Sequence, residues 1–232
     1  MIRSYDDFIT ELLKAGFSMG GGTDNGIFSL INWSWDEAAP YDTPVRWHTG
    51  DPETDPWEWR MRVLEERSDI AYAKLFFKKS GYITKDWYPY FLATRRQNHS
   101  FEEAYQDGKV SHDAKLVYDV VKDQVAVPLH SLKALSNLAQ KEQKSRFDRA
   151  LTELQTKLFI TMCARQQKQS KTGEGYGWYS TVFTTVESFF PADVFAKAAS
   201  FSYEEAVKKI ESQILLLNPQ AKPKDMMKFI KG

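Results

Sequence analysis

This sequence lacks the features of disulfide-held, zinc-thiolate and membrane-spanning proteins. One of its 232 residues is a cysteine, Cys163, which stands in the apolar run LFITMCA. A single thiol cannot form a disulfide framework or a thiolate metal site, so we expect a cytoplasmic protein by default. No run approaches the ~18 apolar residues of a membrane helix. The first residues, MIRSYDDFITELLKAG, lack the apolar centre of a signal peptide.

Net charge and several common motifs are also missing. The 31 basic and 31 acidic residues cancel, so contact with nucleic acid requires local clustering of positive side chains. The patterns GxxxxGK[ST], GxGxxG and GxSxG are absent, which removes the commonest phosphate-loop, dinucleotide and hydrolase signals. The triple glycine at 20–22 predicts a turn into a short strand at 27–31. We expect no metal site, because HxxxH and HExxH spacing is absent among His48, His99, His112 and His130.

Tryptophan, in contrast, is abundant and clustered. Five of the seven tryptophans lie between positions 33 and 59. Asp55 and Pro56 predict a helix start, with Asp as the N-cap and Pro at the first position, where its missing N–H costs nothing. The helix should continue to about residue 67 and place Trp57, Met61 and Leu64 on one face.

Two interpretations of this aromatic stretch remain open. The indoles could form a stacking surface for a flat base or ligand, or they could be core residues, as Trp commonly is. The candidates for stacking are Trp47, Trp57 and Trp59. The candidates for acid or base catalysis are His48, Asp55 and Glu58, although a loop histidine, a helix cap and a first-turn acid are the simpler roles.

The chain as a whole predicts an α+β protein. Residues 1–107 combine helical segments with a hairpin at about 70–83, in which Gly81 suits the turn. From 108 to 190 the pattern is helix, helix, helix, strand, polar turn, strand, which is the order of a winged helix with three helices and a β-wing. Residues 191–232 predict C-terminal helices that pack on the body, one of them begun by the Ser202 and Glu205 capping box.

The predicted third helix and wing are rich in positive charge. In a winged helix these two elements contact DNA, so the sequence favours double-stranded DNA as a partner. The alternative is an ordinary solvated face, because several acids dilute the cations. DNA binding requires the cations to form one accessible face. The candidates are Lys144, Arg146, Arg149, Arg165, Lys168 and Lys171.

Four stretches together resemble a known family. They are DPWEWRMRVLEER, IAYAKLFFKKSGYI, WYPYFLATRR and ELQTKLFITMCARQQKQSKTGEGYGW. These stretches are similar to the AlkZ-related family, bacterial relatives of the winged-helix DNA glycosylases that remove alkylated bases or unhook crosslinks. The resemblance covers about residues 4 to 217.

The resemblance implies base flipping into an aromatic pocket and cleavage of the N-glycosidic bond, without a metal or nucleotide cofactor. Trp57 or Trp59 would stack on the base, and Asp55 or Glu58 would orient water. The glycosylases themselves are longer and carry a Gln-x-Gln or Gln-x-Asp motif in their N-terminal part. Here the matching residues, 167–169, lie in the predicted wing, so no catalytic role is carried over to them.

The function predicted is therefore a DNA-binding protein related to alkylation-repair glycosylases, with or without base excision. Two other classes fit the same sequence. One is a transcriptional regulator whose N-terminal half senses a small molecule, and the other is a module that uses the wing or third helix for protein interaction.

Overall fold

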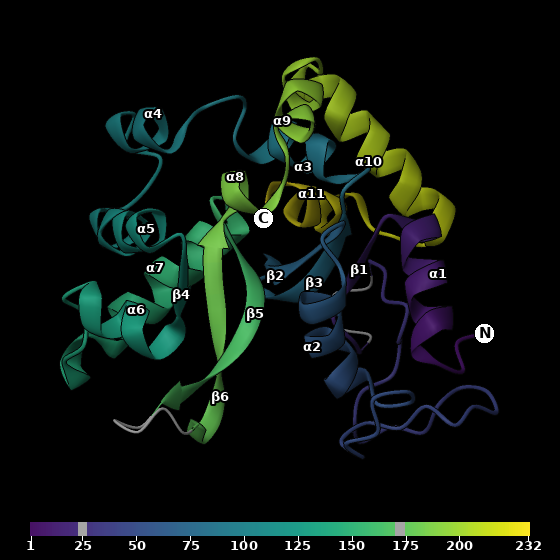
Figure 1. The fold of residues 1–232 in the computed structure, drawn as a ribbon. Coiled ribbons are helices and arrows are strands. Elements are labelled where there is room, and N and C mark those ends of the chain that lie inside the picture. The colour runs from purple at the N-terminus through teal and green to yellow at the C-terminus, as the bar shows by residue number, and fades with distance from the viewer. Residues whose placement is uncertain (23–26, 170–174) are drawn as a thin grey trace.

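The computed structural model describes residues 1–22, 27–169 and 175–232, and for 168, 169 and 175–178 it describes the backbone alone. Within these ranges six strands form one antiparallel sheet in the order β1-β3-β2-β5-β6-β4 (Figure 1). Helices pack on the sheet, so the α+β class is confirmed. The strands are β1 (Phe17–Met19), β2 (Ile70–Phe76), β3 (Lys79–Thr84), β4 (Ala126–Pro128), β5 (Ile160–Gln169) and β6 (Gly175–Thr185).

One face of β1, β3 and β2 is covered mainly by C-terminal helices. Along β2 every second side chain, Ala71, Ala73 and Leu75, enters this core, as the period of two along a strand requires. The capping box of α10 forms as expected, with Ser202 Oγ accepting from the Glu205 N–H. The helices on this face are α3 (Tyr88–Arg95), α8 (Val186–Phe189), α9 (Ala192–Ala199), α10 (Tyr203–Leu217) and α11 (Pro223–Lys231).

The opposite face of the same three strands packs on the N-terminal segment. Ile70 and Tyr72 point to this side, where they meet α1 (Tyr5–Ala15) and α2 (Pro56–Glu66). The loop between β1 and α2 closes the core with Ile31, Trp33 and Val45. This face carries the tryptophan-rich stretch.

A third core lies between β4, β5, β6 and a group of helices (Figure 1). β4 pairs with β6 through Val127 and Phe183, and β6 pairs along its length with β5. In α7 the buried positions recur at helical spacing, with Phe147, Leu151 and Leu154 directed inward as predicted. The helices are α4 (Phe101–Gln106), α5 (His112–Gln124), α6 (Leu129–Leu135) and α7 (Lys144–Thr156), with a short 3-10 turn, η1 (Lys141–Gln143), before α7.

The sheet continues from the first predicted segment into the second. β2 pairs with β5 at Tyr72 and Met162. Beyond that point the partner of β2 is α7 and no longer β5. The Gln155 side chain of α7 accepts the Lys74 backbone N–H at 3.0 Å. The Thr156 hydroxyl donates to the Lys74 carbonyl at 3.2 Å. The start of β5 and the end of α7 are therefore joined to one strand.

Two local predictions are wrong. Residues 27–31 form no strand but an irregular segment whose backbone accepts from Met19 and Gly22. The hairpin is present, but its turn is Phe77 and Lys78 rather than Gly81, which lies inside β3. No helix in the described ranges is both long enough and apolar enough to cross a membrane.

Candidate functional site

Two adjoining hollows lie beside the glycine-rich turn after β1. They have volumes of about 340 and 390 Å³ and share four lining residues, Gly20, Gly21, Trp47 and Trp57. We call them together the aromatic pocket. One hollow is completed by Tyr72, Tyr82, Lys79, Ser80, Met19, Pro56 and Arg60. The other is completed by Gly22, Ser34, Trp35, Glu37 and His48.

The glycines allow the backbone to approach an indole closely. Gly21 has φ 141°, and a Cβ built on it would come within 2.5 Å of the Trp47 ring. Gly20 donates its N–H to the Ser80 carbonyl at 2.9 Å, which ties the turn to β3. Trp47 is fixed from the other side, because its indole N–H donates to the Trp33 carbonyl at 3.2 Å. The triple glycine thus forms a wall of the pocket, and a larger residue at Gly21 would collide with the opposite wall.

Three exposed rings line the mouth of the pocket. Trp35 is 71% exposed and Trp57 is 42% exposed, both high for tryptophan. His48 lies between them, with its ring centroid 4.9 Å from that of Trp57 and 6.4 Å from that of Trp35. The Arg60 guanidinium covers Trp57 at 3.2 Å from the ring centroid. Arg60 thus occupies one face of the Trp57 indole, so a flat ligand can contact only its other face, together with the Trp35 indole and the His48 imidazole.

Asp55 is a structural residue at this site. It is fully buried, and its carboxylate accepts backbone N–H groups from His48, Gly50 and Trp57 at 3.0, 2.9 and 2.8 Å. It caps α2 as the sequence suggests and also holds the preceding loop. With its oxygens turned to the backbone and away from solvent, Asp55 has no geometry for proton transfer to a ligand.

Trp59 and Glu58 also lie outside the pocket. Trp59 is fully buried between Tyr5 and Phe8, so it cannot stack on a ligand. Glu58 faces the long β5–β6 hairpin, where Arg165 approaches it at 3.9 Å. Of the six residues predicted in this stretch, the structure brings together Trp47, Trp57 and His48.

Sequence reasoning missed most of the residues that line the pocket, among them one of the exposed aromatics and a nearby acid. Trp35 and Glu37 stand in the loop 34–55, and no periodicity or motif marks them. The Glu37 carboxylate accepts the Ser34 N–H and hydroxyl at 2.7 and 2.8 Å, which holds it in a tight turn. The only feature of the sequence that indicated a site here was the high number of tryptophans in the whole stretch, and no single position stood out.

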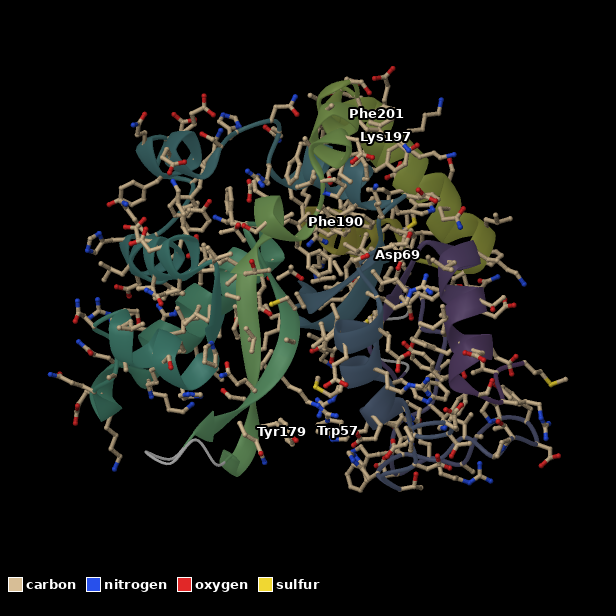
Figure 2. All side chains as sticks on the ribbon, in the orientation of Figure 1. Trp57, Asp69, Tyr179, Phe190, Lys197 and Phe201 are labelled. Carbon is tan, nitrogen blue, oxygen red and sulfur yellow. The ribbon has the colours of Figure 1, made fainter. Side chains whose placement is uncertain are left out.

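The β5–β6 hairpin leans on α2 close to the pocket. Arg165 of β5 forms an ion pair with Glu65 at 2.6 Å and lies over the Tyr179 ring of β6 at 4.8 Å. Tyr179 is 59% exposed. Figure 2 shows Tyr179 and Trp57 at the same end of the molecule, on β6 and α2. Exposed aromatic side chains from two parts of the sequence thus gather at this end.

Of the predicted cations of the third helix and wing, three form ion pairs with acids. Lys144 pairs with Asp148 at 2.6 Å, and Arg146 forms two hydrogen bonds with Asp113, at 2.9 and 2.6 Å. Arg146 holds the pKa of Asp113 below its usual range. Arg165 turns toward the acids of α2, as described above. Arg149 is exposed on α7, and the side chains of Lys168 and Lys171 lie outside the described residues.

The whole chain matches one family model. Residues 2–231 match the model described as AlkZ related. The chain belongs to the AlkZ-related family. Comparisons with curated proteins and with solved structures find no match.

In this AlkZ-related protein the Gln-x-Gln residues at 167–169 lie in β5, at the end of the hairpin arm. Gln167 does not line the aromatic pocket, and the side chains of residues 168 and 169 lie outside the described part of the chain. Among the residues that the structure describes, no three His, Cys, Asp or Glu side chains are grouped closely enough to hold a metal ion.

Proposed function

We propose that this AlkZ-related chain binds double-stranded DNA through a winged helix made of α5, β4, α6, α7, β5 and β6. The observation that carries this proposal is the order of these elements together with the pairing β4-β6-β5. A helix, a short strand, two helices and a two-stranded hairpin are the elements expected of this motif, and they support the proposal. Family membership over residues 2–231 supports the same conclusion.

The aromatic pocket is the proposed site for an extruded, alkylated base. A base alkylated on a ring nitrogen is flat and cationic, so it gains from stacking and from the negative face of an indole. Trp35 and Trp57 offer such faces at the mouth, and Trp47 lines the interior. The Glu37 carboxylate adds a negative charge beside them.

Excision of the base would be a hydrolysis. The N-glycosidic bond breaks, its electron pair goes to the cationic base, and the base leaves as a neutral molecule. Water forms the new bond to C1′ of the sugar and gives up one proton. Within the described residues of the pocket, Glu37 and His48 are placed to accept that proton. His48 is thus retained from the predicted catalytic candidates, and Glu37 takes the place of Asp55 and Glu58.

A ligand-sensing regulator is the second candidate. The observation that favours it is the link between pocket and wing through α2. Trp57 lines the pocket, its neighbour Glu58 contacts Arg165, and Arg165 contacts Tyr179 on the wing. A small flat cation bound at Trp57 would then bias the position of the hairpin.

Binding to two duplexes tests the proposal. Fluorescence anisotropy should show that the protein binds a duplex with one N-alkylated purine more tightly than the unmodified duplex. Trp57→Ala should lower that preference by roughly 5- to 100-fold, since base stacking on an aromatic side chain contributes about 1–3 kcal/mol. Trp57→Phe keeps a ring and should retain most of the preference. Leu216→Ala, at a residue 75% exposed and remote in sequence, serves as the apolar control.

Three outcomes separate the parts of the proposal. No binding to either duplex contradicts the proposed DNA binding. Equal binding to both duplexes by the wild type and by Trp57→Ala contradicts the base pocket and favours the regulator. Release of free base, abolished in Glu37→Gln, supports excision, whereas release that Glu37→Gln and His48→Ala leave unchanged removes the proposed catalytic pair.

A further inference from the structure

The largest charged cavity of those described lies beside α7. It has a volume of about 790 Å³ and is bounded by the outer face of α7, the β2–β3 turn and the end of α11. We call it the basic groove. Six of its twelve lining residues are Lys or Arg and two are acids. The cations are Lys74, Lys78, Arg149, Lys157, Lys228 and Lys231, and the acids are Asp148 and Glu153.

Both acids of the groove already have partners. Asp148 pairs with Lys144 at 2.6 Å, and Glu153 pairs with Lys157 at 3.0 Å. Four of the cations have no ion pair within 4.0 Å in the described part of the chain; they are Lys74, Lys78, Arg149 and Lys231. The lining of the groove therefore has more cations than acids, in a molecule whose net charge is zero.

Hydrogen bonds hold the walls of the groove in place. The Arg95 guanidinium donates to the carbonyls of Leu75, Thr156, Phe229 and Ile230 at 2.7 to 2.9 Å. Those carbonyls belong to β2, to the end of α7 and to α11, which supply all three walls. The spacing of the cations is thus set by the fold rather than by mobile side-chain stems alone.

The groove and the aromatic pocket are neighbours along β2 and at the β2–β3 turn. Tyr72 lines the pocket and Lys74 lines the groove, two residues further along β2 on the same side. At ~3.3 Å per residue they lie about 7 Å apart along the strand, which is the length of about two base steps at ~3.4 Å each. Likewise Lys78 lines the groove, and its neighbour Lys79 lines the pocket.

We propose that the basic groove holds the phosphodiester backbone of the DNA strand whose base enters the aromatic pocket. This inference rests on the proposed function and adds a path for the strand. In this arrangement Arg149 and Thr152, on the outer face of α7, contact the phosphates. The facing side of the groove is formed by the β2–β3 turn and α11, which lie outside the winged helix. Lys78, Lys228 and Lys231 become DNA contacts, although the pattern of a winged helix points to none of them.

The salt dependence of binding tests the groove. In the groove variant, Lys78→Gln, Lys228→Gln and Lys231→Gln are combined. Removing one lysine–phosphate interaction lowers the slope of log K against log salt by about 0.9, so the slope should fall by about 2 to 3. At moderate salt the affinity for the unmodified duplex should fall roughly tenfold or more. The matched control combines Lys208→Gln, Lys222→Gln and Lys224→Gln, which make the same charge change outside the groove.

A charge-restoring variant completes the design. Lys78→Arg, Lys228→Arg and Lys231→Arg together should return the slope to the wild-type value, and equal thermal midpoints would show that all variants are folded. A groove variant that matches the control in slope and affinity overturns the groove even when the wild type binds DNA and prefers the alkylated base. A wild type that binds no duplex instead contradicts the proposed function itself.

Discussion

A single carboxylate organises one wall of the aromatic pocket. Asp55 accepts three backbone N–H groups, two of them from the loop that carries His48. Asp55→Asn replaces one acceptor oxygen with an amide that points a donor at another donor. We expect this change to destabilise the fold by about 1–3 kcal/mol, the usual cost of an unsatisfied buried hydrogen-bonding group.

Chemical denaturation measures that destabilisation. Asp36→Asn is the matched control, since Asp36 is exposed and a surface change of this kind should stay within about 0.5 kcal/mol. If Asp55→Asn is as stable as the control, the cap does not hold the loop. A loss of lesion binding in Asp55→Asn would then point to a direct role of the carboxylate in the site.

The lone cysteine should be unreactive in the folded protein. Burial raises the pKa of the Cys163 thiol to about 11. The thiolate is the reactive form, so a raised pKa leaves roughly one thiol in a thousand ionised at about pH 8. Alkylation by iodoacetamide should be a few hundred times slower than for a free thiol of pKa about 8.5.

Mass spectrometry across a pH series measures the rate. Between about pH 7 and pH 10 the rate should rise roughly tenfold per pH unit, because the thiolate fraction does so below the pKa. The same protein in urea should react at the free-thiol rate. A rate that levels off near the pKa of a free thiol in the folded state would contradict the burial of Cys163.

The tryptophan stretch shows how far single residues can be predicted. The helix start at Asp55 and Pro56 followed from local chemistry, and it is correct. The apolar face that the spacing predicted, with Trp57, Met61 and Leu64, is not the buried one. The helix buries Trp59 and Val63 with Leu64, and Trp57 is exposed. Trp59 is buried because it packs against Tyr5 and Phe8 of α1, which lie some fifty residues earlier in the sequence. Local patterns carry no information about such a partner.

At the scale of elements, the hairpin shows the same limit. Gly81 suggested the turn, yet Phe77 and Lys78 form it with φ of 50° and 61°. Such angles are unusual for residues other than glycine. Gly81 is required elsewhere, since a Cβ there would lie 2.6 Å from the Phe76 ring. The sequence shows the glycine at position 81, but the Phe76 ring that leaves no room for a side chain there is found only once the hairpin is packed.

A strained residue joins α5 to β4. Val125 has φ 63° and ψ −48°, close to the rare form of the γ-turn, and it is 60% exposed. A β-branched residue in such a conformation costs about 1–3 kcal/mol, whereas glycine adds about 0.5–1 kcal/mol of chain entropy. Val125→Gly should therefore stabilise the protein by about 1 kcal/mol and raise the melting temperature by about 2–4 °C.

Differential scanning calorimetry measures this gain. Ala126→Gly, at the next residue and in the extended conformation of β4, should instead lower the melting temperature, because glycine weakens a strand that has no strain to relieve. Equal effects of the two substitutions would show that the backbone at Val125 is relaxed.

At the scale of the whole molecule, the order of elements was predictable but their joining was not. Helix and strand patterns lie within short windows, and the run from 108 to 190 contains α5, α6 and α7 before the paired strands β5 and β6, as predicted, with β4 between α5 and α6. The pairing of Tyr72 with Met162 and the contact of Gln155 with Lys74 link residues about eighty to ninety positions apart. The basic groove arises at this junction, so it could not be found from cation spacing in the third helix and wing.

Arg95 should therefore control both the stability of the molecule and the shape of the groove. Burial lowers its pKa to about 9, so it still carries its charge at neutral pH, and its four carbonyl partners lie in three elements. The carbonyls of Thr156, Phe229 and Ile230 stand at the ends of α7 and α11, where a cation is favoured by the helix dipole. Arg95→Met leaves these carbonyls without their donor and should destabilise the fold by about 3 kcal/mol.

Two probes of denaturant unfolding, tryptophan fluorescence and far-ultraviolet circular dichroism, measure this coupling. In the wild type they should give one coincident transition, since one sheet and one guanidinium join the parts. In Arg95→Met the denaturant midpoint of unfolding should fall. The slope of log K for DNA against log salt should fall as well, because α7 and α11 no longer share a hydrogen-bond donor that holds the groove walls together. Arg3→Met, at an exposed arginine that bonds the single carbonyl of Asp42, is the control. If Arg95→Met unfolds like the control but still lowers the slope, Arg95 acts on DNA directly rather than by holding the groove walls together.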